Sequence, residues 1–292
     1  MMQRYGTDAK PGRSPWLVAA LSHLILVGVS VIVLYPVLWV VRMALTPSQS
    51  FAMGFAPIPA NPSLQNFKDV VLHSDLAGTW VFGHQLANSL IISSVTALVG
   101  VGLATSAAYA FSRFTFPGQR LGLMSLLVTQ MFPGTMMMIP LYILLDTAGL
   151  LDTKTGLVLV YATTSIPFST FMLKGYFDTI PRELEEAARM DGASTLRIFF
   201  GIILPLARPA IAITALFSFM TAWNEFILAA KFMSAETSYT LPVVLQGYVG
   251  EKSTAWGHFA AGAILVSVPV MALFFLLQKN LVEGLTAGSV KG

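Results

Sequence analysis

The sequence predicts an all-α integral membrane protein, a polytopic bundle of six transmembrane helices. Hydrophobic residues make up 55% of the 292 positions and charged residues only 11%, and the mean hydropathy is +0.72. These values lie far from those of soluble proteins, in the direction of membrane spans. A helix crosses a bilayer with about 20 mainly apolar residues, and six stretches meet that requirement: 16–41, 86–111, 121–145, 157–177, 204–230 and 256–277.

The first span is expected to remain as a helix. The hydrophobic region of a signal peptide is only about 7 to 15 residues long, whereas the whole of 16–41 lacks a charged residue. The first stretch is therefore interpreted as a span and not as a cleaved leader.

Lysine and arginine in the short loops predict the orientation, because these residues resist translocation and acidic residues have little effect. With the N-terminus in the cytoplasm, basic residues favour that side by more than two to one. The cytoplasmic set is Arg4, Lys10, Arg13, Arg113, Arg120, Lys174, Arg182, Arg189, Arg197, Arg208, Lys279 and Lys291; the outer set is Arg42, Lys68, Lys154, Lys231 and Lys252. Both termini are thus predicted to be cytoplasmic. The chain divides into an N-terminus (1–15) and a membrane domain (16–292), which includes a charged segment (178–208) and a tail (279–292).

Composition argues against several kinds of site. Without cysteine the chain has no disulfide, thiolate nucleophile or cysteine-ligated metal, and its four histidines are scattered. No basic cluster with interleaved aromatic residues points to nucleic acid. No lysine follows a glycine, so no Walker A loop can be written and the chain is not expected to hydrolyse ATP.

Several predicted spans carry proline in mid-membrane: Pro36, Pro133, Pro140, Pro167, Pro209 and Pro269. Each removes a backbone donor and kinks a helix, which membrane bundles tolerate where neighbours or a water-filled path compensate. Two interpretations are open for TQMFPGTMMMIP, at 129–140. It is either ordinary bundle geometry or part of a translocation path.

Glu225 lies near the outer end of the predicted fifth span. An ionisable group within a span is a functional candidate. The alternative is an interfacial carboxylate that reaches water beside Trp223.

The stretch DTIPRELEEAARMDGAS predicts a short cytoplasmic helix between spans four and five. Pro181 suits the first turn of a helix, and Glu183, Glu185 and Glu186 follow where a helix N-terminus favours negative charge. Glu185 and Arg189 form a favourable i,i+4 pair. The helix is expected to cross the mouth of the bundle.

The helix is predicted to stop at Gly192, which supplies the left-handed conformation that follows a helix C-terminus. Ser194 or Thr195 then caps a second helix, whose apolar residues recur at helical spacing: Leu196, Phe199, Phe200 and Ile203. The small side chains of Ala187 and Ala188 would let a cytoplasmic protein grip the first helix. A helix lying on the membrane surface is the alternative, although three glutamates would be repelled by anionic headgroups.

The spacing in this region carries a resemblance to a known family. Glu186-Ala187-Ala188 is followed after three residues by Gly192, after nine more by Ile202, and after one more by Leu204-Pro205. This pattern is similar to the EAA signature of binding-protein-dependent ABC importer permeases. KGYFDTIPRELEEAARMDGAS and the ending LVEGLTAGSVKG resemble the G-type permease subunits of maltose and maltodextrin importers. The resemblance covers nearly the whole chain and implies the type I ABC importer permease fold.

The resemblance also implies site residues. In that family the EAA helix sits in a cleft of the ATPase subunit, which makes the signature the coupling site: Glu186, Ala187, Ala188, Gly192, Ile202, Leu204 and Pro205. The C-terminal tail reaches between two ATPase subunits, and the matching residues are Gly284, Leu285, Thr286, Ala287, Gly288 and Lys291. The last outer loop, 231–255, is the region that probes the sugar-binding protein.

The partners implied are an F-type homologous permease, two copies of a cytoplasmic ATPase subunit, a sugar-binding protein at the outer face, and membrane lipid. ATP and Mg would be bound by the ATPase subunits, with no cofactor in this chain. The resemblance places the protein in the cytoplasmic (inner) membrane of a prokaryote.

The substrate implied is maltose, a maltodextrin or a related α-glucoside. Another sugar, such as trehalose, stays open because the sugar contacts in maltose systems lie mostly on the F-type partner. The alternative from a different class is an ion-driven secondary carrier, but such carriers often show inverted repeats and midplane charges, and the predicted spans lack a midplane carboxylate. A membrane-embedded hydrolase would need clustered catalytic residues that the sequence lacks.

Overall fold

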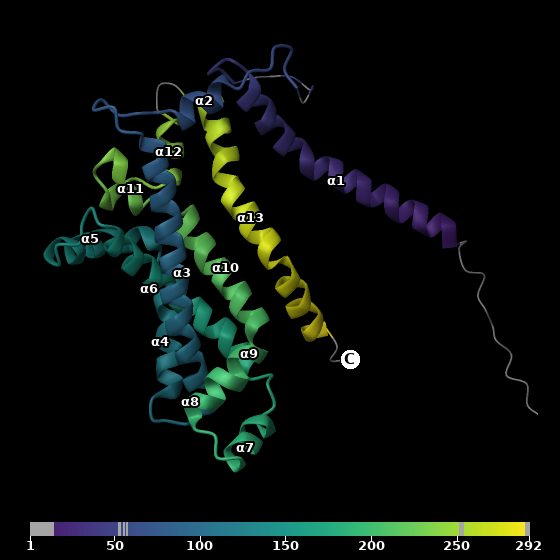
Figure 1. Ribbon diagram of the computed structural model, residues 1–292, viewed down its shortest axis with the longest axis vertical. Helices are drawn as coiled ribbons and strands as arrows, with labels where there is room; N and C mark the ends of the chain where they lie inside the picture. Colours follow the sequence, from purple (N-terminus) through teal and green to yellow (C-terminus); the bar gives the residue numbers. More distant parts are fainter. Residues whose placement is uncertain (1–14, 52–53, 55, 57, 251–253, 290–292) are drawn as a thin grey trace, which may run out of the picture.

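The computed structural model describes residues 15–51, 54, 56, 58–250 and 254–289, and only the backbone of residues 15, 17 and 279–289. These residues form a helix bundle (Figure 1) whose only β-pairing among them is two isolated bridges. The long helices are α1 (Pro15–Leu45), α3 (Val81–Arg113), α6 (Lys154–Phe177), α10 (Arg208–Asn224) and α13 (Trp256–Ser289). The shorter elements are α2 (Gln65–Val71), α4 (Gln119–Met131), η1 (Gly134–Met137), α5 (Met138–Thr147), α7 (Glu183–Met190), α8 (Thr195–Ile198), η2 (Phe199–Ile203), α9 (Leu204–Leu206), α11 (Ala229–Phe232), η3 (Glu236–Ser238) and α12 (Leu241–Gly247).

Within the described residues, four helices are long and apolar enough to cross a membrane, or up to six spans if each of two bent pairs counts as one. The first pair joins Gln119–Met131 to Gly134–Thr147 with a bend of 93°, and the second joins Thr195–Leu206 to Arg208–Asn224 with a bend of 78°. The predicted all-α polytopic bundle is confirmed. The third and fifth predicted spans are broken helices.

Proline explains where both helices break. The first break leaves Phe132 extended (φ −77°, ψ 128°) directly before Pro133, a conformation that proline imposes on the preceding residue. At the second break, Pro205 and Pro209 supply no N–H to the carbonyls four residues earlier. The chain responds with the π-helical turn η2 before Pro205 and a bend at Ala207.

Helices α3 and α6 form the centre of the bundle (Figure 1). They approach closely because small residues of α3 face α6. Ala104 and Ala108 are fully buried, and a Cβ at Gly100 would lie 2.6 Å from the Ser165 Oγ. Helix α10 packs against both, and α13 packs against α10.

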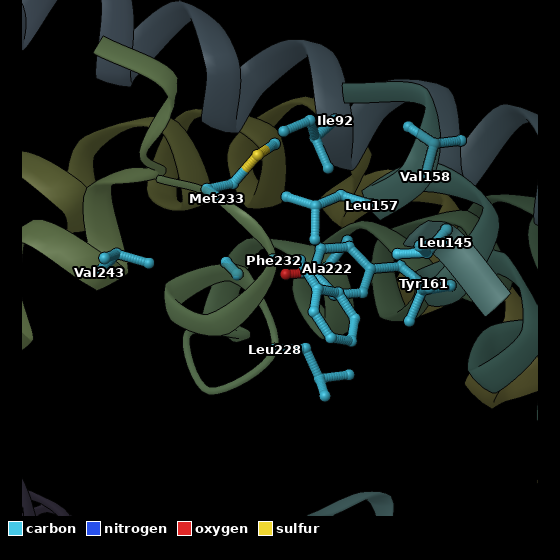
Figure 2. Packing of buried hydrophobic residues seen from close by; sticks show 12 residues of the cluster. Ile92, Leu145, Leu157, Val158, Tyr161, Ala222, Leu228, Phe232, Met233 and Val243 are labelled. Atoms are coloured by element: carbon cyan, nitrogen blue, oxygen red, sulfur yellow. The ribbon is translucent and has the colours of Figure 1, made fainter. Parts of the chain in front are cut away.

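Apolar clusters at the two ends of the bundle join helices that are distant in the sequence. Figure 2 shows the cluster at one end, where Ile92 of α3, Leu157 of α6 and Ala222 of α10 gather with Phe232 of α11. The cluster at the other end includes Phe177, Phe199 and buried alanines of α3. Each end of the bundle is therefore packed as a unit around α3 and α6.

Helix α1 leaves the bundle, as Figure 1 shows, and packs against α13 and α2 through its C-terminal part. Its most apolar stretch has none of its residues buried within the chain. This surface requires an apolar environment, which lipid or another membrane subunit supplies.

Glu225 stabilises local structure. Helix α10 ends at Asn224, not at residue 230 as predicted, and Glu225 is extended. Its carboxylate accepts hydrogen bonds from the backbone N–H of Leu228 (2.9 Å) and of Ala229 (3.2 Å), and from the Tyr161 hydroxyl (2.6 Å). Glu225 thus caps the turn that leads into α11.

Candidate functional site

The predicted cytoplasmic helix is α7, which projects at the end of the bundle opposite α2 and α12 (Figure 1). It begins at Glu183, and the carbonyl of Arg182 accepts from the N–H groups of Glu185 and Glu186, both at 3.0 Å. Pro181 precedes the helix and is not in its first turn, so the predicted start was early. The three glutamates lie in the first turn, as the charge pattern predicted.

Gly192 ends α7 as predicted. Its φ is +81°, a backbone conformation that costs free energy for any residue with a Cβ. The N–H of Ala193 donates to the carbonyl of Ala188 (2.9 Å), and the N–H of Gly192 donates to that of Arg189 (3.0 Å). This pair of bonds is the Schellman motif, and it fixes the direction in which the chain leaves the helix.

Ser194, not Thr195, caps the second helix, because its side chain accepts from the Arg197 N–H. The predicted apolar face is divided. Phe199 and Ile203 are buried, whereas Leu196 and Phe200 are 69% and 63% exposed.

The main residue that the sequence reasoning missed is Arg113, the last residue of α3. Its Nε donates to the Glu185 Oε1, and both side chains are 4% exposed. The Glu185 Oε2 accepts from the Tyr109 hydroxyl (3.1 Å), and the Arg113 Nη2 donates to the carbonyl of Ile180 (2.9 Å). The predicted partner Arg189 lies at 3.9 Å and is half exposed. A buried carboxylate requires such a cation, so Arg113 is the dominant partner.

A second set of polar contacts fixes the segment before α7 to the same end of α3. The Ser112 hydroxyl donates to Asp178 (2.6 Å), and Arg182 donates to the carbonyl of Ser112 (3.1 Å). Lys174 pairs with Asp178 at 2.7 Å. Burial raises the pKa of Asp178, but hydrogen bonds from Lys174 and Ser112 outweigh this effect and hold the pKa below its usual value. Asp178 therefore remains ionised at neutral pH.

The predicted coupling residues fall into two groups. Glu186, Ala187 and Gly192 are exposed on α7 and its terminal turn. The other four, Ala188, Ile202, Leu204 and Pro205, are partly buried. The first three of these pack against the apolar cluster around Phe177 and Phe199. The first group is available to another protein, whereas the second connects α7 to the bundle.

The predicted tail contact lies in and beyond the last turns of α13. The backbone is helical to Ser289, so Gly284, Leu285, Thr286, Ala287 and Gly288 continue that helix. Lys291 lies outside the described residues.

Comparisons with known proteins match most of the chain to components of transport systems. A family model described as binding-protein-dependent transport system inner membrane component matches residues 100–286. The sequence is 38% identical over 272 residues to the galactooligosaccharides transport system permease protein GanQ of Bacillus subtilis (strain 168), covering 93% of this chain and 95% of that protein. It is 35% identical over 289 residues to the maltose/maltodextrin transport system permease protein MalG of Yersinia pestis, covering 93% of each.

A solved structure shares the fold. It is the crystal structure of a bacterial ABC transporter involved in the import of the acidic polysaccharide alginate, one chain of which matches with a TM-score of 0.75 and 24% sequence identity. The match covers 93% of this chain and 100% of that chain. The predicted importer-permease fold is thereby confirmed.

Proposed function

Because this chain belongs to the family of binding-protein-dependent transport system inner membrane components, we propose that it is the permease subunit of an ATP-driven sugar importer. The observation that carries the proposal is similarity to sugar permeases over 93% of the chain. The chain contributes the membrane path, and ATP is hydrolysed by a separate subunit.

The coupling site in this proposal is the exposed part of α7, which carries the EAA signature. Glu186 and Ala187 contact a cytoplasmic ATPase subunit, and two copies of that subunit bind ATP and Mg. The geometry supports this role because Glu185 and Arg113 tie α7 to α3 with a buried ion pair. A displacement of α7 by the ATPase therefore moves α3, as a lever moves the element to which it is fixed.

The second half of the signature serves transmission within the chain. Ile202 and Leu204 pack on the same apolar cluster as Ala188, and the π turn and bend that surround them connect α7 to α10. We assign Ile202, Leu204 and Pro205 to this connection. The residues Gly284 to Gly288 of the tail are proposed as a second ATPase contact.

The orientation and remaining partners complete the proposal. The α7 end faces the cytoplasm with both termini, and the end with α2 and α12 faces outward toward a sugar-binding protein. The bare apolar surface of α1 supports contact with a homologous F-type permease. The substrate is an oligosaccharide; an α-glucoside such as a maltodextrin and a galactooligosaccharide are both represented among the relatives.

Uptake of radiolabelled maltotriose into proteoliposomes tests the function. The chain alone is compared with the chain assembled with partner permease, ATPase and binding protein. Each is measured with ATP on the ATPase side, with an ion gradient in place of ATP, and with neither. We expect uptake only by the complete complex and only with ATP. Ion-gradient-driven uptake by the chain alone would favour the secondary carrier instead.

A further inference from the structure

The end of the bundle opposite α7 contains a pocket of about 680 Å³, within the range of about 300–1,000 Å³ typical of small-ligand sites. Four regions of the chain form its walls: α2 with His73 shortly after it, the segment around η3, α12 with Tyr248 directly after it, and the start of α13. The polar and aromatic lining residues are Asp69, His73, Glu236, Tyr239, Tyr248 and His258.

Two imidazole–carboxylate pairs stand on the pocket walls. His73 Nε2 lies 2.8 Å from the Glu236 Oε1, and His258 Nε2 lies 3.2 Å from the Asp69 Oδ2. Each carboxylate therefore has one imidazole nitrogen within hydrogen-bonding distance. The second oxygen of Glu236 and the hydroxyls of the lining residues retain hydrogen-bonding capacity toward a ligand.

Buried amides of α3 hold one wall of this pocket in place. Asn88 Nδ2 donates to the carbonyls of Thr237 (2.8 Å) and Tyr239 (3.1 Å), and Gln85 Nε2 donates to the carbonyl of Glu236 (3.2 Å). Asn88 and Gln85 are almost completely buried. The wall that carries Glu236 and Tyr239 is therefore preorganised, which lowers the entropic cost of binding.

Another part of the lining combines aromatic and apolar surface. The ring of Tyr248 lies 5.6 Å from that of His258, and Val243 and Val244 line the pocket beside it. Burial, with the carboxylates of Glu236 and Asp69, raises the pKa of the Tyr248 hydroxyl, so this group remains a donor at neutral pH. A sugar ring has apolar C–H faces and a rim of hydroxyls that both donate and accept, and these walls offer partners for each.

We propose that this pocket binds one end of a neutral oligosaccharide at the outer face of the permease, before the sugar enters the membrane path. The assignment deepens the proposed importer function and rests on it. Among the described residues, no three His, Asp or Glu side chains are placed to share a metal ion. The two carboxylates disfavour an anion, and their remaining oxygens can accept from the hydroxyls of an uncharged ligand.

Because the chain lacks cysteine, single cysteines report on the pocket without background. Ser234→Cys and Val244→Cys place a thiol in its lining, and Leu76→Cys, fully exposed outside the pocket, is the matched control. Each variant is assembled with its partner subunits in lipid discs and labelled with a maleimide in millimolar maltotriose, in a β-galactooligosaccharide, in sugar-free binding protein, or in buffer.

We expect at least one free sugar to slow labelling at both pocket positions by about tenfold or more and to leave Leu76→Cys unchanged. Adding Glu236→Gln should weaken that protection. Three results would overturn the proposal: equal labelling with and without every sugar, equal protection of the control, or protection by the binding protein but by no free sugar. ATP hydrolysis by the wild-type complex, stimulated by sugar-loaded binding protein, is measured in parallel. Its absence would contradict the importer function, whereas its presence without protection would contradict only the pocket.

Discussion

Arg113, at the end of α3, is buried against Glu185 of α7, 72 residues later in the chain. Both side chains are 4% exposed, and the carboxylate also accepts from the Tyr109 hydroxyl. The helix that carries Glu186, Ala187 and Ala188 is thus fixed to α3 by a charged contact of two other residues. Under the proposed function, this relationship makes Glu185 and Arg113 positioning residues for coupling.

Replacement of Glu185 should release α7 from the bundle. Removing one partner of a buried ion pair costs about 3–5 kcal/mol because the other charge is left unpaired. For Glu185→Ala we expect amide hydrogen exchange in 183–193 to accelerate by about 100-fold or more, since about 1.4 kcal/mol corresponds to a factor of ten. Glu183→Ala, on the same helix but exposed, is the control and should change exchange little. Equal effects of the two substitutions would show that the ion pair does not hold α7.

Gly192→Ala should weaken the end of α7 through the backbone alone. A Cβ at this position would have no neighbour within 4 Å, so no clash arises. The left-handed conformation costs a residue with a Cβ about 1–2 kcal/mol, and Asn tolerates it better than Ala. We expect the ratio of sugar uptake to ATP hydrolysis to fall in Gly192→Ala and to fall less in Gly192→Asn. It should fall most in Gly192→Pro, because proline removes the hydrogen bond to the Arg189 carbonyl. An unchanged ratio of uptake to hydrolysis in all three variants would contradict a coupling role for the turn.

Ala187→Cys should crosslink to the ATPase subunit in the assembled complex, because Ala187 is exposed on α7. A short bifunctional thiol reagent and one cysteine in the proposed ATPase cleft provide the measurement. Leu121→Cys, exposed at the start of α4, is the control and should not crosslink. Failure of Ala187→Cys to crosslink to any cytoplasmic subunit would contradict the assignment of α7 as the coupling site.

Glu225→Ala should loosen the turn that leads into α11 and leave α7 unchanged. The loss of a helix-cap acceptor costs about 0.5–2 kcal/mol, and here two backbone donors and the Tyr161 hydroxyl lose their partner. We expect faster amide exchange in 226–233. Asn224→Ala, at the exposed neighbouring position, should have little effect. An uptake defect in Glu225→Ala without faster exchange would return Glu225 to the functional candidates.

The long apolar helices and the turn at Gly192 could be predicted from the sequence, because hydropathy and the left-handed preference of glycine act locally. The proline positions were visible as well, but the bends of 93° and 78° depend on how neighbouring helices accommodate each break. Glu185 was predicted to pair with Arg189, since helical spacing shows only local partners. Arg113 could not be paired from one sequence because packing alone decides which cytoplasmic ends meet. A basic residue that ends an apolar span, opposite an acidic loop on the same side, is the signal that could have suggested it.

ATP hydrolysis by the complete complex in lipid discs tests the central claim most directly. The binding protein is loaded in turn with maltose, longer maltodextrins, a galactooligosaccharide, trehalose or no sugar. An importer whose ATPase is coupled through α7 should hydrolyse ATP faster with at least one loaded binding protein, and Glu185→Ala should abolish most of that stimulation while Glu183→Ala retains it. A well-assembled complex that ignores every loaded binding protein, or a stimulation that Glu185→Ala leaves intact, would contradict the account.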